Sequence, residues 1–268
     1  MFNCSQNSTW TYHESDGIGF FSVDALTATG LVSMAFSARQ GGVSRGRFAS
    51  LNQGLHVGDH PQLVLQNRQL LAAVVGIPYQ LAVVPAQVHG DQVKLVGRSD
   101  AGAGATNLES SIPGCDALIT REVNLPLVTH HADCVALFIL DPRQRAIGLA
   151  HAGWKGTAKK IGSRTIEAMQ LHFGTRPEDC LVGISPSIGP CCYEVGQLVL
   201  QQFAAAFAYH SELIRPAAAE RAYLDLWEAN RRPLLERGVK PEHILVSRLC
   251  TCCLAEHFYS YRRETGGV

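Results

Sequence analysis

Short apolar runs constrain the fold of this chain more than any other feature of its sequence. They are rich in Val, Leu and Ile and are bounded by Gly, Pro or Asp, a pattern typical of β-strands. The predicted strands are 31–37, 81–88, 93–96, 117–120, 125–129, 135–140, 146–150, 181–184 and 244–247. Those between residues 81 and 150 follow one another without a helical pattern between them. This order predicts an α+β fold with layered, mixed sheets rather than a strict βαβ repeat.

Apolar residues at helical spacing predict a smaller set of helices, at 61–75, 157–173, 197–207 and 226–237. The first begins with Pro61 and ends before Gly76, which are typical start and stop signals. Pro233 is expected to kink the last helix. The segment 97–114 is rich in Gly and Ser, so we predict a mobile loop that could act as a lid.

The length and composition of the chain predict a single domain over residues 1–268. Of its 268 residues, 46% are hydrophobic, which is ample for a buried core. Residues 1–20 are expected to be loosely ordered. The 23 basic and 23 acidic side chains cancel, so net charge does not favour nucleic acid or an anionic membrane as a partner. No apolar run has the length of about 18 residues that would predict a membrane span.

The cysteines indicate a reducing, cytoplasmic environment. There are nine of them, an odd number, and the N-terminus shows no secretory signal pattern. Cys250, Cys252 and Cys253 are closer together than the pairs of a zinc knuckle, which have about two to four residues between them. We interpret these three, and the adjacent Cys191 and Cys192, as packing residues.

Three segments at the ends of predicted strands carry metal-ligand chemistry. His89 closes one strand, Cys134 precedes another, and His151 follows a third. Two imidazoles and one thiolate form a ligand set that suits one zinc ion and leaves its fourth position open for water or substrate. The alternative is that all three are packing or capping residues, because isolated Cys and His side chains more often have that role.

The same residues permit a second interpretation. Cys134 could be a nucleophile with His151 as its base, although a zinc-bound thiolate would be a poor nucleophile. Asp133 could orient a ligand or transfer a proton, or it could simply form a turn. These possibilities stay open on the residues alone.

Two glycine-containing turns could bind an anion. In the first, Gly153 and Gly156 permit a tight turn into a helix, where Lys155 would attract phosphate. In the second, Arg39 and Ser44 flank a diglycine and could converge on an anion, and the nearby Asn52 could bind a base or a sugar. A capped helix and a hairpin turn are the structural alternatives.

Several segments, taken in order, resemble the YfiH-like family, also labelled laccase-domain proteins, multicopper polyphenol oxidases or peptidoglycan editing factors. They are ARQGGVSRGRFASLNQGLHVGD, QVHG, GCDALIT, HHADC, LAHAGWKGT, SIGPCCYEVG and FYSYRR. The resemblance extends over about residues 31–265, and the pairing of HAGWKG with an upstream ADC is its most specific part. His131 departs from it, since the family often has Thr before ADC.

The resemblance implies an α/β/β/α sandwich and a zinc ion bound by His89, Cys134 and His151. It also implies activity on purine nucleosides: phosphorolysis of adenosine, inosine or methylthioadenosine, or deamination of adenosine. Arg39 is then expected to engage phosphate or substrate. Because the zinc-deaminase signature H-x-E with P-C-x-x-C is absent from the sequence, we expect Asp133 to act in proton transfer in any deamination. Purine nucleoside and phosphate are the expected partners.

Two other activities remain as hypotheses. One is a Cys134–His151 hydrolase or amidase that edits peptidoglycan precursors. The other, ranked last, is a copper polyphenol oxidase, because a multicopper centre needs many closely spaced histidines and the sequence has no H-x-H pair.

Overall fold

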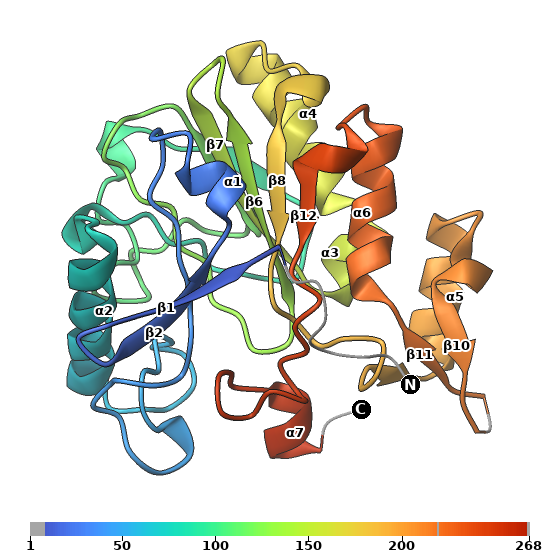
Figure 1. The fold of residues 1–268 in the computed structure, drawn as a ribbon, viewed down its shortest axis with the longest axis horizontal. Coiled ribbons are helices and arrows are strands. Elements are labelled where there is room, and N and C mark those ends of the chain that lie inside the picture. The colour runs from blue at the N-terminus through green and yellow to red at the C-terminus, as the bar shows by residue number, and fades with distance from the viewer. Residues whose placement is uncertain (1–8, 219, 267–268) are drawn as a thin grey trace.

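A mixed six-stranded sheet forms the centre of the molecule in the computed structural model, which describes residues 9–218 and 220–266 (Figure 1). Its strands, in spatial order, are β12 (Ile244–Val246), β8 (Leu181–Ile184), β6 (Val135–Asp141), β7 (Ala146–Ala152), β5 (Ala117–Thr120) and β4 (Val93–Leu95). The outer pairs β12–β8 and β5–β4 are parallel, and the other neighbours are antiparallel. The sheet is therefore mixed, as predicted.

Side-chain alternation divides the central strands between two cores. In β6, Val135, Leu137 and Ile139 belong to a core shared with helices, whereas Phe138 and Leu140 belong to a second core on the opposite face. Both faces of the strand are thus covered by protein, which explains why its sequence is almost continuously apolar.

Helices cover the first face. They are α3 (Trp154–Ala158), α4 (Ile161–Phe173) and α6 (Leu226–Glu236). The helix α4 lies on β7, β5 and β4 and buries Ile161, Ile166 and Met169. Asp225 caps α6 by accepting a hydrogen bond from the backbone of Glu228 at 3.0 Å.

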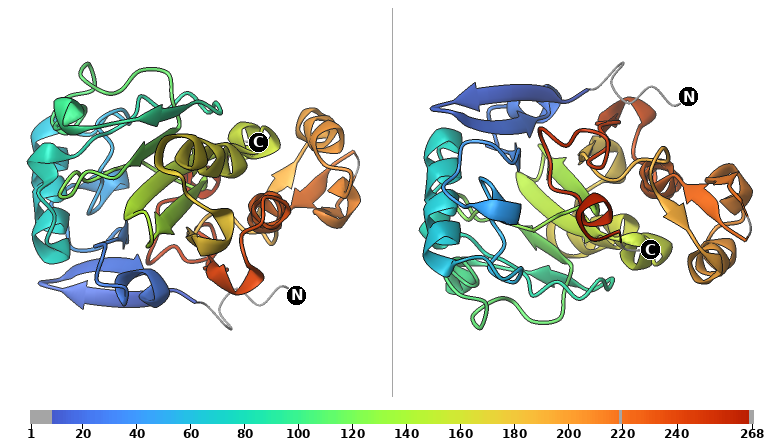
Figure 2. Two further views of the ribbon diagram at one scale, coloured as in Figure 1. Left: turned by 90° about the horizontal axis from the view of Figure 1, so that it is seen from above. Right: turned by 90° about the horizontal axis from the view of Figure 1, so that it is seen from below.

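A small sheet covers the second face. It contains β1 (Thr11–Ser15), β2 (Ile18–Ser22) and β3 (Phe36–Ser37), and α2 (Pro61–Val75) contacts β2. In both views of Figure 2, α2 and this sheet lie to one side of the central strands. The layers confirm the predicted α+β class and its α/β/β/α order.

The remaining elements lie at the periphery. A third sheet of β10 (Ile214–Pro216), β11 (Ala222–Leu224) and β9 (Glu194–Val195) accompanies α5 (Gln197–Ala206) on the other side of the molecule (Figure 2). The short helices are α1 (Asp24–Thr27) and α7 (Tyr261–Thr265). Within the described residues, no helix combines the length and the apolar character needed to cross a bilayer.

Four predictions about elements were wrong. The segments 81–88 and 125–129 form isolated bridges instead of strands, and 31–37 contributes only β3. The helix predicted at 157–173 starts at Trp154 and is interrupted at Lys160, which has a left-handed φ of 59°.

Residues 9–20 were also mispredicted, because most of them form a hairpin instead of a loose segment. The turn residues Asp16 and Gly17 both have positive φ, at 50° and 74°, as Asp-Gly hairpins require. Residues 1–8 lie outside the described part of the chain.

Candidate metal centre

One edge of the central sheet gathers the predicted metal ligands. His89 lies in the loop before β4, Cys134 lies directly before β6, and His151 is near the end of β7. Since β7 runs antiparallel to both β5 and β6, and β5 is parallel to β4, the end of β7 meets the starts of the other three strands. The topology thus brings together residues that are far apart in the sequence.

The three predicted ligands form a compact group. The ligand atoms of His89, Cys134 and His151 lie within 4.8 Å of one another. The two imidazole rings are perpendicular, with centroids 4.8 Å apart. His151 is buried, Cys134 is half-buried and His89 is exposed, so the group opens to solvent on the His89 side. Two imidazole nitrogens and a thiolate are a donor set that fits zinc with an open position.

Gly153 keeps this space clear. A Cβ atom at this position would lie 3.0 Å from Cδ2 of His89 and 3.1 Å from Sγ of Cys134. Its φ of −64° is ordinary, so glycine is needed for the close approach and not for the backbone conformation.

Asp116 belongs to the candidate site, although the sequence interpretation did not single it out. Its fully buried carboxylate accepts a hydrogen bond from Nδ1 of His151 at 2.8 Å, which leaves Nε2 of that ring for a metal. It also accepts hydrogen bonds from the backbone amides of Val88, His89 and Gly90 at 2.7–3.2 Å. One carboxylate therefore orients two of the three ligands. The signal for it was a lone acidic residue at the start of the apolar strand β5.

The protonation of the group favours a thiolate. Burial raises the pKa of Cys134, but hydrogen bonds with His151 and His89 outweigh this effect and bring the pKa to about 7. Burial lowers the pKa of His151, but its hydrogen bonds with Asp116 and Cys134 raise it to about 9. A pKa of about 7 makes the thiolate of Cys134 accessible near neutral pH, and a thiolate is the form that binds metal or acts as a nucleophile.

His131 connects this group to a large cavity. Its ring centroid is 5.2 Å from that of His151, and its nitrogens contact Thr129 Oγ1 at 2.8 Å and the carbonyl of Cys134 at 3.2 Å. Burial and then the charge of His151 lower the pKa of His131 well below its usual range. It is therefore a neutral imidazole.

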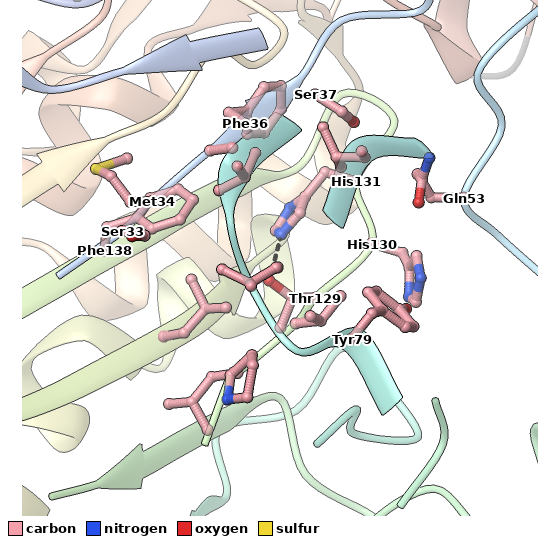
Figure 3. A pocket seen from close by; sticks show the side chains of 18 of the residues that line it. Ser33, Met34, Phe36, Ser37, Gln53, Tyr79, Thr129, His130, His131 and Phe138 are labelled. Carbon is pink, nitrogen blue, oxygen red and sulfur yellow. Dashed lines mark hydrogen bonds between the residues drawn. The ribbon is translucent and has the colours of Figure 1, made fainter. Parts of the chain in front are cut away.

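The cavity lies on the face of the sheet that is turned away from α4 and has a volume of about 1050 Å³. Figure 3 shows His131 and Thr129 in its wall, with Met34, Phe36 and Phe138 on the apolar side and Gln53, His130 and Tyr79 across from them. Its lining includes His131, whose ring lies against that of His151, but does not include His89, Cys134 or His151. Its size and mixed lining are those of a small-molecule pocket.

The predicted anion-binding residues do not converge with the metal ligands. The Nε and Nη2 atoms of Arg39 donate to the carbonyl of Ala49 at 3.1 and 2.9 Å, and its guanidinium stacks on Tyr259, a residue of the cavity wall. Lys155 is exposed at the start of α3, with its ammonium 5.5 Å from the centre of the Trp154 ring.

Ser44 and Asn52 lie in a separate buried network. Both donate to the same carboxylate oxygen of Asp59, at 2.7 and 2.9 Å. Asn67 of α2 in turn donates to Ser44 Oγ at 2.8 Å. These contacts tie the diglycine segment to α2.

Asp133 faces the C-terminal segment. Its carboxylate accepts hydrogen bonds from Thr251 Oγ1 at 2.6 Å, Ser260 Oγ at 3.0 Å and the amide of Arg262 at 2.7 Å. With three donors on it, this carboxylate anchors residues 251–262 next to Cys134. A role of Asp133 in proton transfer stays a prediction.

Comparison with known families gives one match over most of the chain. The family described as "Multi-copper polyphenol oxidoreductase laccase" matches residues 33–268. This agrees with the resemblance read from the sequence motifs.

Individual relatives extend the comparison. The chain is 41% identical over 231 residues to "Purine nucleoside phosphorylase YlmD" of Geobacillus stearothermophilus, covering 86% of this chain and 84% of that protein. It is 32% identical over 231 residues to "Adenosine deaminase RL5" of an unknown prokaryotic organism, covering 85% and 88%. The crystal structure of YlmD from G. stearothermophilus superposes with a TM-score of 0.90 at 37% identity, covering 97% of this chain and 95% of that one.

Proposed function

Because the chain belongs to the multi-copper polyphenol oxidoreductase laccase family, the YfiH-like proteins, we propose that it is a zinc-dependent purine nucleoside phosphorylase. The observation that carries the proposal is the convergence of His89, Cys134 and His151 beside a pocket large enough for a nucleoside. The names of the relatives supply the substrate class. Adenosine, inosine and methylthioadenosine are the proposed substrates, with phosphate as the second reactant.

Zinc is the proposed ion because of the donors. When bound, it supplies Lewis acidity and an open coordination position. Copper fits less well, although the family name mentions it. Within residues 9–218 and 220–266, the groups able to hold an ion are this set and a cluster of four cysteines, and neither offers the many imidazoles of a multicopper centre.

The residues of the chain have separate proposed tasks. Asp116 fixes the orientation of His151 and of the His89 loop. Lys155, which is exposed on α3, is proposed to attract phosphate. Arg39 is proposed to shape the pocket through Tyr259 while contributing positive charge to substrate binding. His131 lines the cavity with both ring nitrogens engaged by Thr129 and Cys134, so its proposed task is to shape the wall between the pocket and His151.

The test is a product analysis of the zinc-loaded protein with each nucleoside, with and without phosphate. Phosphorolysis occurs only when phosphate is present, and it gives the free base with ribose 1-phosphate, or with 5-methylthioribose 1-phosphate in the case of methylthioadenosine. We expect His89→Ala to lose this activity and His60→Ala, which changes an exposed histidine at the start of α2, to keep it. Failure of the zinc-loaded protein to convert any of the nucleosides would overturn the proposal.

Adenosine deamination is a second activity of the same proposed site, and it is supported by the similarity to the RL5 deaminase. It would convert adenosine to inosine and ammonia without consuming phosphate. The assay above therefore separates the two activities.

The protonation of Cys134 and His151 favours one further candidate, a cysteine hydrolase or amidase acting on peptidoglycan precursors. Such an enzyme would not need a metal. Hydrolysis of precursors that persists after complete zinc removal, and that is lost in Cys134→Ser, would favour it over the phosphorylase.

A further inference from the structure

Two cysteine-containing segments meet beyond the ends of β8 and β12. Cys191 and Cys192 follow β8, and Cys250 and Cys253 follow β12. These strands are parallel neighbours, and the pairing continues past them through a bridge between Ser187 and Cys250. Cys250 is part of the hydrophobic core and Cys191 and Cys192 pack against it, as the sequence interpretation expected, and the pairing of the two strands also brings the four sulfurs together.

The distances between the sulfur atoms are those of ligands around one ion. Sγ of Cys253 lies 3.4 Å from Sγ of Cys192 and 3.6 Å from Sγ of Cys191, and all four Sγ atoms lie within 4.8 Å of one another. A tetrahedral zinc ion with Zn–S bonds of about 2.3 Å places its sulfurs about 3.8 Å apart. A disulfide would bring two of them to about 2.05 Å.

The surroundings suit a negatively charged site. The amide of Gly189 donates to Sγ of Cys250 at 3.3 Å, a contact that supports a thiolate ligand. Arg262 donates to the carbonyl of Cys192 at 3.3 Å, and Arg263 to that of Cys252 at 3.1 Å. Four thiolates and one Zn²⁺ ion have a net charge of −2. The two positively charged guanidinium groups compensate for this charge. Cys253 is exposed and gives an ion access from solvent.

We propose that Cys191, Cys192, Cys250 and Cys253 bind a second, structural zinc ion. This ion would link the loop that follows β8 to the loop that follows β12. A closed set of four thiolates leaves no position for substrate, which distinguishes it from the His89–Cys134–His151 group. Thr251 lies within the loop that follows β12 and donates to Asp133 at 2.6 Å. The ion would thereby hold the segment that supports Cys134.

Zinc and iron content per chain test this proposal, measured on protein purified under reducing conditions. We expect two zinc ions per chain in the unaltered protein and one in Cys253→Ser. Cys252→Ser is the matched control, because Cys252 is in the same loop but outside the group, and it should keep two. Cys134→Ser should keep one zinc, which separates failure of this proposal from failure of the proposed function.

A second measurement covers the case in which Cys253→Ser does not fold. Cobalt substitution in the unaltered protein should give the strong sulfur-to-cobalt charge-transfer absorption of a tetrathiolate site, and Cys134→Ser should retain most of it. No zinc retained in a folded Cys134→Ser variant, stoichiometric iron in place of zinc, or a disulfide among these cysteines found by mass spectrometry would each overturn the assignment.

Discussion

At the residue scale, the candidate metal centre depends on two residues that are not among its proposed ligands. Asp116 receives four hydrogen bonds, and each of them fixes a ligand or the backbone beside one. Gly153 keeps a side chain out of the space next to Cys134. These two residues permit predictions that separate positioning from ligation.

We expect Asp116→Asn to weaken zinc binding about 10- to 100-fold, the usual effect of losing a carboxylate that supports a ligand. The amide can no longer accept from both His151 and the backbone of residues 88–90. Competition with a zinc-binding dye measures the affinity. Asp91→Asn is the control, because Asp91 contacts Lys159 and Arg164 and not the ligands. Equal zinc affinity in both variants would show that Asp116 does not position the site.

Gly153→Ala should reduce zinc affinity about tenfold or more, since ligands must be held within about 0.5 Å of productive geometry. Its added methyl would contact His89 and Cys134 at close range, whereas the backbone conformation tolerates alanine. Gly97→Ala adds a methyl into open space and should change nothing. Zinc titration measures the affinity of both variants, and thermal unfolding checks that each variant is folded. If Gly153→Ala binds zinc as tightly as the unaltered protein, Gly153 is not needed to keep the space beside Cys134 open.

At the element scale, α2 holds the segment that the sequence suggested as a mobile lid. Arg68 of α2 is 1% exposed and donates to the carbonyls of Gly104 and Ala105 at 3.2 and 2.7 Å, and to Gln53 at 2.9 Å. It also donates to His130 at 3.0 Å. The loop 97–114 is therefore fixed from inside the molecule.

Arg68→Met should destabilise the protein by about 3 kcal/mol, because it leaves buried carbonyl groups without donors. Amide hydrogen exchange in 97–114 should accelerate most. Gln69→Met, on the exposed side of the same helix, should leave both quantities unchanged. Unaltered exchange of the loop in Arg68→Met would mean that other contacts fix it.

The elements that the sequence predicts well are those whose environment is encoded locally. The strands β5, β6, β7 and β8 are buried on both faces, so their apolar runs are sufficient to locate them. The segment 81–88 is equally apolar, but it forms only single bridges at Val83 and Pro85. In this segment the apolar sequence reflects burial of the side chains and does not indicate pairing with a neighbouring strand.

The candidate site was predictable in part. His89, Cys134 and His151 were identified by residue type and by their family motifs, and the structure brings them together. The role of Asp116 depends on which strand lies beside β7, and the cysteine cluster depends on the pairing of β8 with β12. Such neighbours are set by the tertiary fold, and spacing within one segment does not reveal them.

At the scale of the whole molecule, the N-terminal hairpin joins the layers into one unit. Trp10, just before β1, is 5% exposed and packs edge-on against Phe138 of β6, with ring centroids 5.7 Å apart. Its Nε1 donates to the carbonyl of Leu245 in β12 at 3.1 Å. One side chain thus connects the small sheet to two strands of the central sheet.

Unfolding at a fixed zinc concentration should therefore show a single transition, as expected of one domain. Trp10→Ala should lower the unfolding free energy by about 3–5 kcal/mol within that same transition, because it removes a buried aromatic and its hydrogen bond. Denaturant titration followed by both circular dichroism and the fluorescence of the remaining tryptophans, Trp154 and Trp227, makes the measurement. Tyr12→Ala changes a partly exposed aromatic of the same hairpin and should cost much less. If circular dichroism and fluorescence report transitions at different denaturant concentrations in Trp10→Ala, the hairpin and the central sheet unfold independently. The single-domain prediction would then be wrong.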